Sequence, residues 1–237
     1  KKNLGYGNGN NFGLKKIKTK YVLILNPDTI CEKNFFKKIS NLIKNDLNFH
    51  IIGSQYPNNI NLPAGYFNHK KNNIFKNNFK KKKLDYLTKV DWVVGFSMLV
   101  NLSKFKNKKI FDSNFFLFFE ETDLCMRVIK KGGNIFTCRG LRVHHLWGKG
   151  SLRENNKEKN DLKLLREWHN MWSSYYFYKK HKGYIAALSK HFYIFLRTLI
   201  KMIYFNIILN EKKRDRYKYR LLGLLNSVLN KPSFLRK

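Results

Sequence analysis

The chain has 237 residues, carries 48 Lys and Arg against 15 Asp and Glu, and has a formal net charge of +33. Because 43% of the residues are hydrophobic and 16% are aromatic, the composition excludes a disordered polycation and allows one large or two small folded domains. The basic residues are 38 Lys and only 10 Arg, a bias typical of A/T-rich coding sequence rather than of phosphate recognition, which favours Arg, so nucleic acid is not the expected partner.

The first part of the chain follows a strand, loop and helix order. Residues 5–13 are rich in Gly and Asn and predict a turn that leads into a short helix at residues 14–18. The apolar run at residues 21–25 predicts a strand buried on both faces, and apolar residues between 35 and 43 recur at helical spacing. This order is typical of an open, mostly parallel α/β sheet that binds ligands beyond the carboxyl ends of its strands.

The middle of the chain alternates polar and apolar segments. Residues 55–83 carry Pro, Gly and several Lys runs, which predict a surface excursion. After it the sequence predicts a strand-like run at residues 90–100 and a helix at 120–129 that a pair of glycines ends at 132–133. Two short strands follow at residues 135–137 and 143–145.

The last part of the chain is helical in pattern. We expect residues 1–151 to form the α/β domain and residues 152–237 to form a basic, amphipathic helical region. In that region Lys190, Arg197 and Lys201 would lie in one stripe along a helix. The stripe suits either a membrane surface or a packed helix with a solvated edge, and both interpretations stay open. The charges interrupt the apolar run too often for a membrane span.

Cysteine usage points to a reducing compartment. Cys31, Cys125 and Cys138 are an odd number of thiols with no close pair and no CxxC spacing. Neither a disulfide framework nor a zinc site is indicated.

The segment Asn26-Pro27-Asp28 follows the first strand directly. A carboxylate at a strand end points into the crevice where open α/β folds bind ligands, and it suits a hard cation such as Mg²⁺ or Mn²⁺ on a diphosphate. All three residue types also favour turns. Taken alone, the turn is the better interpretation.

Three acids fall within four residues at Glu120, Glu121 and Asp123, in a chain with only 15. A positioned carboxylate can act as a general base. Acids in the first turn of a helix also complement its dipole, and Asp123 has Arg127 four residues on. Capping explains Asp123 well and Glu121 poorly.

Two histidines, His144 and His145, end the last predicted strand before a Gly-rich loop. Neutral imidazole is a common metal ligand, and glycines let a backbone approach phosphate closely. A surface or core role is at least as compatible with this pattern.

The order of these segments resembles that of the family-two glycosyltransferases, inverting enzymes with the GT-A fold, and especially their rhamnosyltransferase-like branch. The segments that carry the resemblance are NLGYGNGNNFGL (3–14), YVLILNPDT (21–29), VDWVVGFSMLV (90–100), IFDSNFFLFFEETDLCMRVIKKGG (110–133) and VHHLWGKGS (143–151).

The resemblance implies a role for individual positions. Asp28 occupies the place of the family's metal-binding motif, and His145, favoured over His144, would complete the metal or diphosphate site. Glu121 occupies the place of the catalytic base. Residues in the remaining matching positions are implied to line the nucleotide-sugar and acceptor pocket: Asn11, Gly13, Asn26, Trp92, Gly95, Glu120 and Asp123.

The resemblance also implies a fold and a reaction. The fold is an open GT-A-like α/β sheet flanked by helices, followed by the helical region, and about two βα units of ~30 residues each that family members carry at their start are missing here. The reaction is metal-dependent transfer of a sugar from a nucleotide-sugar donor to a glycan or lipid-linked acceptor, with inversion, at the inner face of the cell membrane. The alternatives are a non-catalytic remnant of such an enzyme and a basic protein that binds nucleic acid or another anionic surface.

Overall fold

The computed structural model describes residues 3–45, 47–57, 64–65, 67, 87–146, 156–233 and 235. The chain divides into two compact units. The sheet unit comprises Asn10–Phe111 and Glu121–Leu152, and the helical unit comprises Lys1–Gly9, Asp112–Glu120 and Arg153–Lys237. The domain boundary expected at residues 151 and 152 lies outside the described residues, as does most of the expected polar excursion at 55–83.

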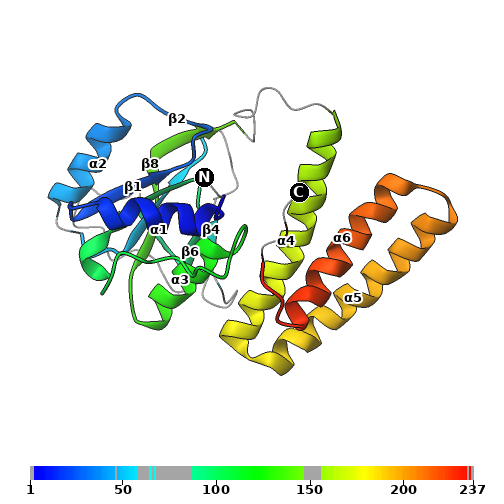
Figure 1. Ribbon diagram of the computed structural model, residues 1–237. Coiled ribbons are helices and arrows are strands. Elements are labelled where there is room, and N and C mark those ends of the chain that lie inside the picture. Colours follow the sequence, from blue (N-terminus) through cyan, green and yellow to red (C-terminus); the bar gives the residue numbers. More distant parts are fainter. Residues whose placement is uncertain are drawn as a thin grey trace. The chain divides into compact units, whose positions relative to one another are not determined.

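The sheet unit is built on a six-stranded sheet with the order β1-β7-β3-β8-β2, in which β5 also pairs with β8 (Figure 1). A separate two-stranded sheet joins β4 and β6. The strands are β1 (Tyr21–Leu25), β2 (Thr29–Cys31), β3 (Ile51–Gln55), β4 (Ala64–Gly65), β5 (Leu87–Val90), β6 (Trp92–Val93), β7 (Ser97–Asn101) and β8 (Ile135–His145).

The expectation of a mostly parallel sheet is wrong for the described strands. Among these strands, β3 and β8 pair in parallel, whereas β1 with β7, β3 with β7, β2 with β8 and β5 with β8 are antiparallel. The prediction that residues 21–25 form a strand buried on both faces is wrong in its burial, because β1 lies at one end of the strand order and Ile24 is its one buried residue. β7 is fully buried, but burial does not set strand direction. The parallel pair is joined by a long connection that includes a helix, as parallel pairing requires.

β8 is one strand of 11 residues where two short strands were expected. Its first residues pair with β3 and β5, and its last three pair with β2. A register shift between Gly53 and Gln55 of β3 accommodates the intervening residues of β8. The strand therefore continues unbroken from the sheet core to His145.

Helix α1 (Tyr6–Lys16) replaces the turn expected at residues 5–13. Tertiary contacts offset the poor helix propensity of its glycines and asparagines. Asn11 is buried, donates from Nδ2 to the Phe111 carbonyl at 2.8 Å, and accepts from the Phe111 N–H at 3.0 Å. Leu14, on the same helix, is also buried.

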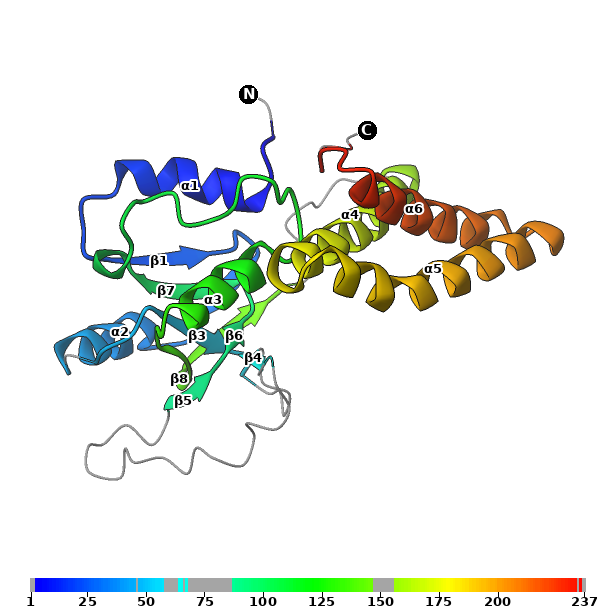
Figure 2. The same ribbon diagram turned by 90° about the horizontal axis from the view of Figure 1, so that it is seen from below.

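Two further helices belong to the sheet unit and agree with the spacing of apolar residues (Figure 2). Helix α2 (Phe35–Lys44) buries Phe35, Ile39 and Leu42 in the main hydrophobic core. Helix α3 (Glu120–Lys130) begins at the last residue assigned to the helical unit and continues in the sheet unit. It ends at Lys130, just before the expected glycine pair, and the φ of 74° at Gly132 suits glycine.

The helical unit contains three long helices, α4 (Asn156–Lys182), α5 (Tyr184–Ile207) and α6 (Glu211–Val228). Gly183, with a φ of 90°, separates α4 from α5. Helix α6 packs closely on α4, where Ser227 Oγ donates to the Trp172 carbonyl at 2.9 Å. Among the described residues, no helix is long and apolar enough to cross a membrane.

Substitutions at two helical glycines test the packing of α6 on α4. A Cβ on Gly223 of α6 would lie 2.2 Å from the Trp168 carbonyl oxygen, whereas a Cβ on Gly9 of α1 would have nothing within 4 Å. We expect Gly223→Ala to destabilise the protein by about 1–3 kcal/mol through overpacking. The matched Gly9→Ala should stabilise it by up to about 1 kcal/mol through helix propensity. Urea unfolding measures both, and equal effects of the two substitutions would contradict the packing described.

Candidate active site

The carboxylate of Asp28 and the imidazole of His145 meet at the carboxyl ends of β1 and β8. Asp28 Oδ1 lies 3.2 Å from His145 Nε2, and the two side chains are 16% and 13% exposed. Asn26 Nδ2 lies 3.4 Å from the same ring nitrogen. The structure therefore brings His145 to the Asn26-Pro27-Asp28 segment, and the sequence analysis had selected these two segments separately.

Backbone hydrogen bonds hold the segment that carries Asp28. The Asn26 N–H donates to the Phe96 carbonyl at 2.9 Å, and the Leu146 N–H donates to the Asp28 carbonyl at 2.8 Å. Thr29 Oγ1 donates to the Asn26 carbonyl at 2.6 Å. Residues 27 and 28 form a turn, so the turn and the functional interpretation of this segment are compatible.

Strand alternation separates the two histidines. β2 pairs with the end of β8 so that Thr29 faces His145 and Ile30 faces His144. His144 is exposed, whereas His145 is largely covered. Because neighbouring side chains of a strand point to opposite faces, His145 alone of the two reaches Asp28.

An aromatic pair borders the site and was not identified from the sequence. The Phe96 ring centroid lies 5.5 Å from that of His145, and Tyr56 stacks on Phe96 at 4.8 Å with an interplanar angle of 12°. Burial raises the pKa of the Tyr56 hydroxyl. The buried Gly95 comes just before Phe96, so the expected pocket residue is the neighbour of the ring that borders the imidazole.

Glu121 lies in the first turn of α3, in a desolvated environment. Burial raises the pKa of its carboxyl, and hydrogen bonds with the backbone and with Thr122 lower it by less. Four residues on, burial raises the pKa of the Cys125 thiol to about 12, and that thiol has a hydrogen bond with the Val93 backbone. The negative charge of Glu121 also raises the Cys125 pKa. Because residues four apart share one face of a helix, Glu121 and Cys125 lie on the same face of α3.

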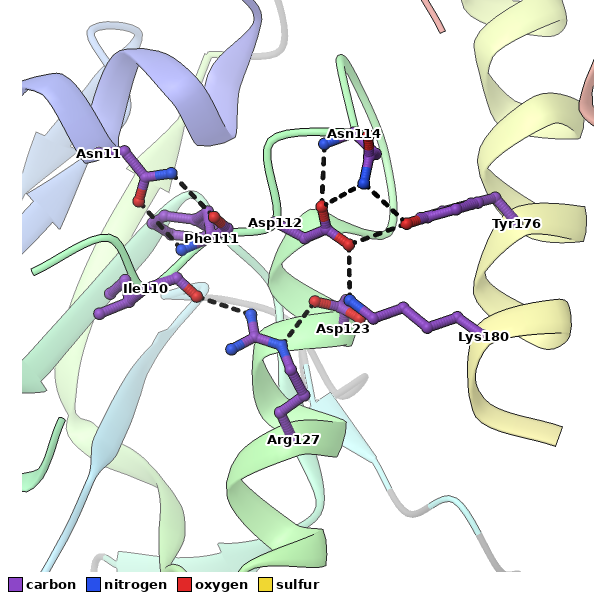
Figure 3. Close-up of polar contacts among 9 residues, drawn as sticks. All are labelled: Asn11, Ile110, Phe111, Asp112, Asn114, Asp123, Arg127, Tyr176 and Lys180. Carbon is purple, nitrogen blue, oxygen red and sulfur yellow. Dashed lines mark hydrogen bonds and ion pairs between the residues drawn. The ribbon is translucent and has the colours of Figure 1, made fainter. Parts of the chain in front are cut away.

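Asp123 has the structural role that the capping interpretation predicts. Its buried carboxylate accepts from Arg127 Nε at 2.8 Å, and Arg127 also donates to the Ile110 carbonyl at 2.6 Å (Figure 3). Asn11 bonds to the next residue, Phe111. Asn11 and Asp123 thus hold the 110–111 backbone, and their implied pocket role stays a prediction.

A second polar cluster in Figure 3 lies within the helical unit. Asp112 Oδ2 accepts from Lys180 Nζ at 2.6 Å and from the Tyr176 hydroxyl at 3.1 Å. Asp112 Oδ1 accepts from the Asn114 N–H at 2.9 Å. These bonds fasten the 112–114 segment to α4, and they were not foreseen because the partners are far apart in sequence.

The other predicted pocket residues have distinct surroundings. Trp92 on β6 pairs with Gly65 on β4, and a Cβ on Gly65 would lie 2.8 Å from the Trp92 ring. Gly13 lies on α1 with open space around it. Glu120 is buried at the start of α3. Their roles toward a ligand stay predictions.

The three cysteines are free thiols, with Cys125 and Cys138 buried and Cys31 half-buried. Burial raises the pKa of all three. A raised pKa favours the protonated thiol, which is the less reactive form.

Comparison with known proteins shows the family of the chain. Residues 1–148 match the protein family "Glycosyl transferase family 2", a span that includes Asp28, Glu121 and His145. Since the match covers more than half of the chain, the protein belongs to glycosyl transferase family 2.

A similar curated protein is the "Low-salt glycan biosynthesis hexosyltransferase Agl10" of Haloferax volcanii. It is 26% identical over 151 residues, which cover 60% of this chain and 49% of the relative. The chain therefore spans about half the length of this relative.

The desolvated, half-buried Glu121 makes the free energy of unfolding depend on pH. Because the folded-state pKa is raised, the folded protein holds a proton that the unfolded chain releases, so stability falls as pH rises from the ordinary glutamate range through the folded pKa. We expect Glu121→Gln to stabilise the protein at neutral pH by about 1.4 kcal/mol for each pH unit by which the folded-state pKa of Glu121 exceeds its unfolded-state pKa. The gain should vanish in acid, below the unfolded pKa.

Urea unfolding at neutral and acid pH measures this effect. Glu211→Gln, on the exposed start of α6, is the control and should change stability little at either pH. A Glu121→Gln protein that is less stable than the wild type at neutral pH would show that the ionised carboxylate is well solvated.

Proposed function

We propose that this chain transfers a hexose, with rhamnose the first candidate, from a nucleotide-sugar donor to a glycan or lipid-linked acceptor, with inversion at the anomeric carbon. The observation that carries the proposal is the 3.2 Å contact of Asp28 with His145 inside the segment that matches glycosyl transferase family 2. The hexosyltransferase name of the similar archaeal protein supports the sugar class. A lipid-linked acceptor would be met at the inner face of the cell membrane.

The residues at this site fit a divalent cation. A carboxylate and an imidazole lie close enough to share one ion, and both side chains are mostly covered. No group of three or more His, Cys, Asp or Glu side chains suited to a metal occurs among the described residues. Mg²⁺ and Mn²⁺ suit such a sparse set, because Mg²⁺ binds through one or two protein carboxylates and takes its other ligands from phosphates and water.

A cation held there would supply charge stabilisation to the departing nucleoside diphosphate. His145 and Asp28 would hold and orient the diphosphate end of the donor. Asn26, whose amide already reaches His145 at 3.4 Å, would limit the rotation of the imidazole. The Tyr56 and Phe96 rings would shield this end of the site from water.

Glu121 would act as the general base. The acceptor hydroxyl oxygen forms a bond to the anomeric carbon as the bond from that carbon to the diphosphate oxygen breaks, and the hydroxyl proton passes to the Glu121 carboxylate. A raised pKa makes this carboxylate a stronger base than an ordinary glutamate. Because one displacement occurs on the face opposite the leaving group, the product has inverted configuration.

Kinetic measurements on variants test the proposal. The assay measures nucleoside diphosphate released from UDP-, GDP- and dTDP-linked hexoses, dTDP-rhamnose included, with Mn²⁺ and a lipid extract as acceptor source. We expect Glu121→Gln to lower the turnover rate by about 10²–10⁴-fold while donor binding is kept. Asp28→Asn should weaken donor binding as well, and Glu211→Gln should match the wild type.

The outcomes separate the candidate functions. Wild-type rates in both Glu121→Gln and Asp28→Asn would refute the proposed roles. A wild-type protein that binds donor with Mn²⁺ but releases no diphosphate would identify a non-catalytic family member.

A further inference from the structure

The outward face of α5 in the helical unit is apolar. Ile185, Phe192, Ile200 and Ile207 are 82%, 63%, 65% and 71% exposed. The other large apolar side chains exposed on this helix are Tyr184, Leu188, Tyr193, Leu196, Ile203 and Tyr204. An exposed apolar surface that follows a whole helix marks an interaction site rather than ordinary surface variation.

The exposed apolar residues share one side of α5. Ala187, His191 and Thr198 are the buried residues of the helix and mark the side that packs on its neighbours. At 100° per residue, Phe192 and Ile200 point away from that side. The helix is therefore apolar where it should meet water, the reverse of a helix with a solvated edge.

Basic side chains border the outward face. Lys190, Arg197 and Lys201 fall in one stripe along the flank of the apolar arc. Lys190 and Arg197 are exposed, and Lys201 Nζ lies 5.5 Å from the centre of the Tyr217 ring. The sequence of α5 contains no Asp or Glu. An apolar face with a purely basic border is the pattern of a helix that lies in the plane of a membrane interface.

A cavity of about 480 Å³ opens beside this face. Its rim includes Leu188, Phe192 and Leu225, which are themselves exposed. Its walls are almost wholly apolar and include Tyr175 and Val228 of the neighbouring helices. The cavity extends the apolar surface inward, and its size and lining suit part of a hydrocarbon chain.

We propose that the helical unit docks on an anionic phospholipid bilayer through this face, with α5 lying in the interface and its basic border on the lipid phosphates. The charge of the basic border favours a bilayer over a second copy of the chain as the partner that covers this face. An antiparallel pair of α5 helices related by a two-fold axis would bring the two basic borders close together, whereas an anionic leaflet attracts them, at about 1 kcal/mol for each Lys or Arg near its surface. Shallow insertion also agrees with the absence of a membrane-spanning helix among the described residues.

This proposal rests on the helical unit alone, so it can fail or succeed independently of sugar transfer. The experiment is flotation of the full chain with vesicles of phosphatidylcholine, either pure or with about one-third phosphatidylglycerol, at low salt and at about 0.5 M NaCl. The wild type should float with the anionic vesicles, float far less with the neutral ones, and be partly released by salt.

Three variants examine the separate parts of the surface. Phe192→Glu with Ile200→Glu should weaken binding at least tenfold. Lys190→Gln with Arg197→Gln and Lys201→Gln should weaken it by about a hundredfold on anionic vesicles, as expected for three lost surface cations. Phe36→Glu is the matched control, because Phe36 on α2 is 66% exposed and should leave flotation unchanged.

Two further measurements keep the test decisive. Ile185→Ser with Ile207→Ser removes apolar area without adding charge, and it should also weaken flotation. This pair tests the apolar face even if the two glutamates disturb the fold. Sedimentation equilibrium detects a dimer of the chain formed through the outward face of α5. A wild-type protein that stays unbound on anionic vesicles, or a dimer that the Phe192→Glu and Ile200→Glu substitutions dissociate, would overturn the proposal.

Discussion

The contact between Asp28 and His145 depends on the register of one long strand. β8 runs without a break from the core, where Ile135 pairs with Ile51, to His145, which pairs with Thr29. The register shift opposite β3 sets which face of β8 each later residue occupies. A slip of one residue would place His144 beside Asp28 and turn His145 to the surface. The chemistry proposed for this site therefore depends on strand pairing as much as on residue type.

The two carboxylates with proposed roles differ in environment, and the difference matches their tasks. Asp28 lies against the His145 imidazole, which the Asn26 amide also contacts, and a carboxylate beside an imidazole suits binding of a positive ion. Glu121 lies in a desolvated site where burial raises its pKa, which suits proton transfer. We expect the desolvation of Glu121 to cost stability at neutral pH, as is common at functional sites.

Sequence patterns predicted the elements whose burial is local. The spacing of Phe35, Ile39 and Leu42 indicated α2 because these residues reach one core from one face, and the glycine after α3 indicated its end. The patterns failed where long-range contacts decide. α1 forms in a Gly- and Asn-rich segment whose Asn11 bonds to Phe111, 100 residues away. The apolar runs did not indicate whether neighbouring strands pair in parallel or antiparallel.

The same distinction applies to the candidate site. Asp28 and His145 could be selected from their places at strand ends, and the choice of His145 over His144 agrees with strand alternation. The Tyr56 and Phe96 stack could not be found, because Tyr56 follows β3 and Phe96 precedes β7, and these two paired strands are far apart in the chain. The apolar character of α5 was visible in the sequence, but which side of the helix faces outward required the packing of Ala187 and His191.

Metal binding is the direct test of a divalent-cation site at Asp28 and His145. Mn²⁺ is titrated into the protein in the presence of a nucleoside diphosphate, and electron paramagnetic resonance measures the free ion. We expect Asp28→Asn and His145→Ala each to weaken Mn²⁺ binding by about tenfold or more, and His144→Ala, which changes the neighbouring imidazole on the opposite face, to leave it unchanged. Equal Mn²⁺ affinity in the wild type and in the Asp28→Asn and His145→Ala variants would contradict a metal site at Asp28 and His145.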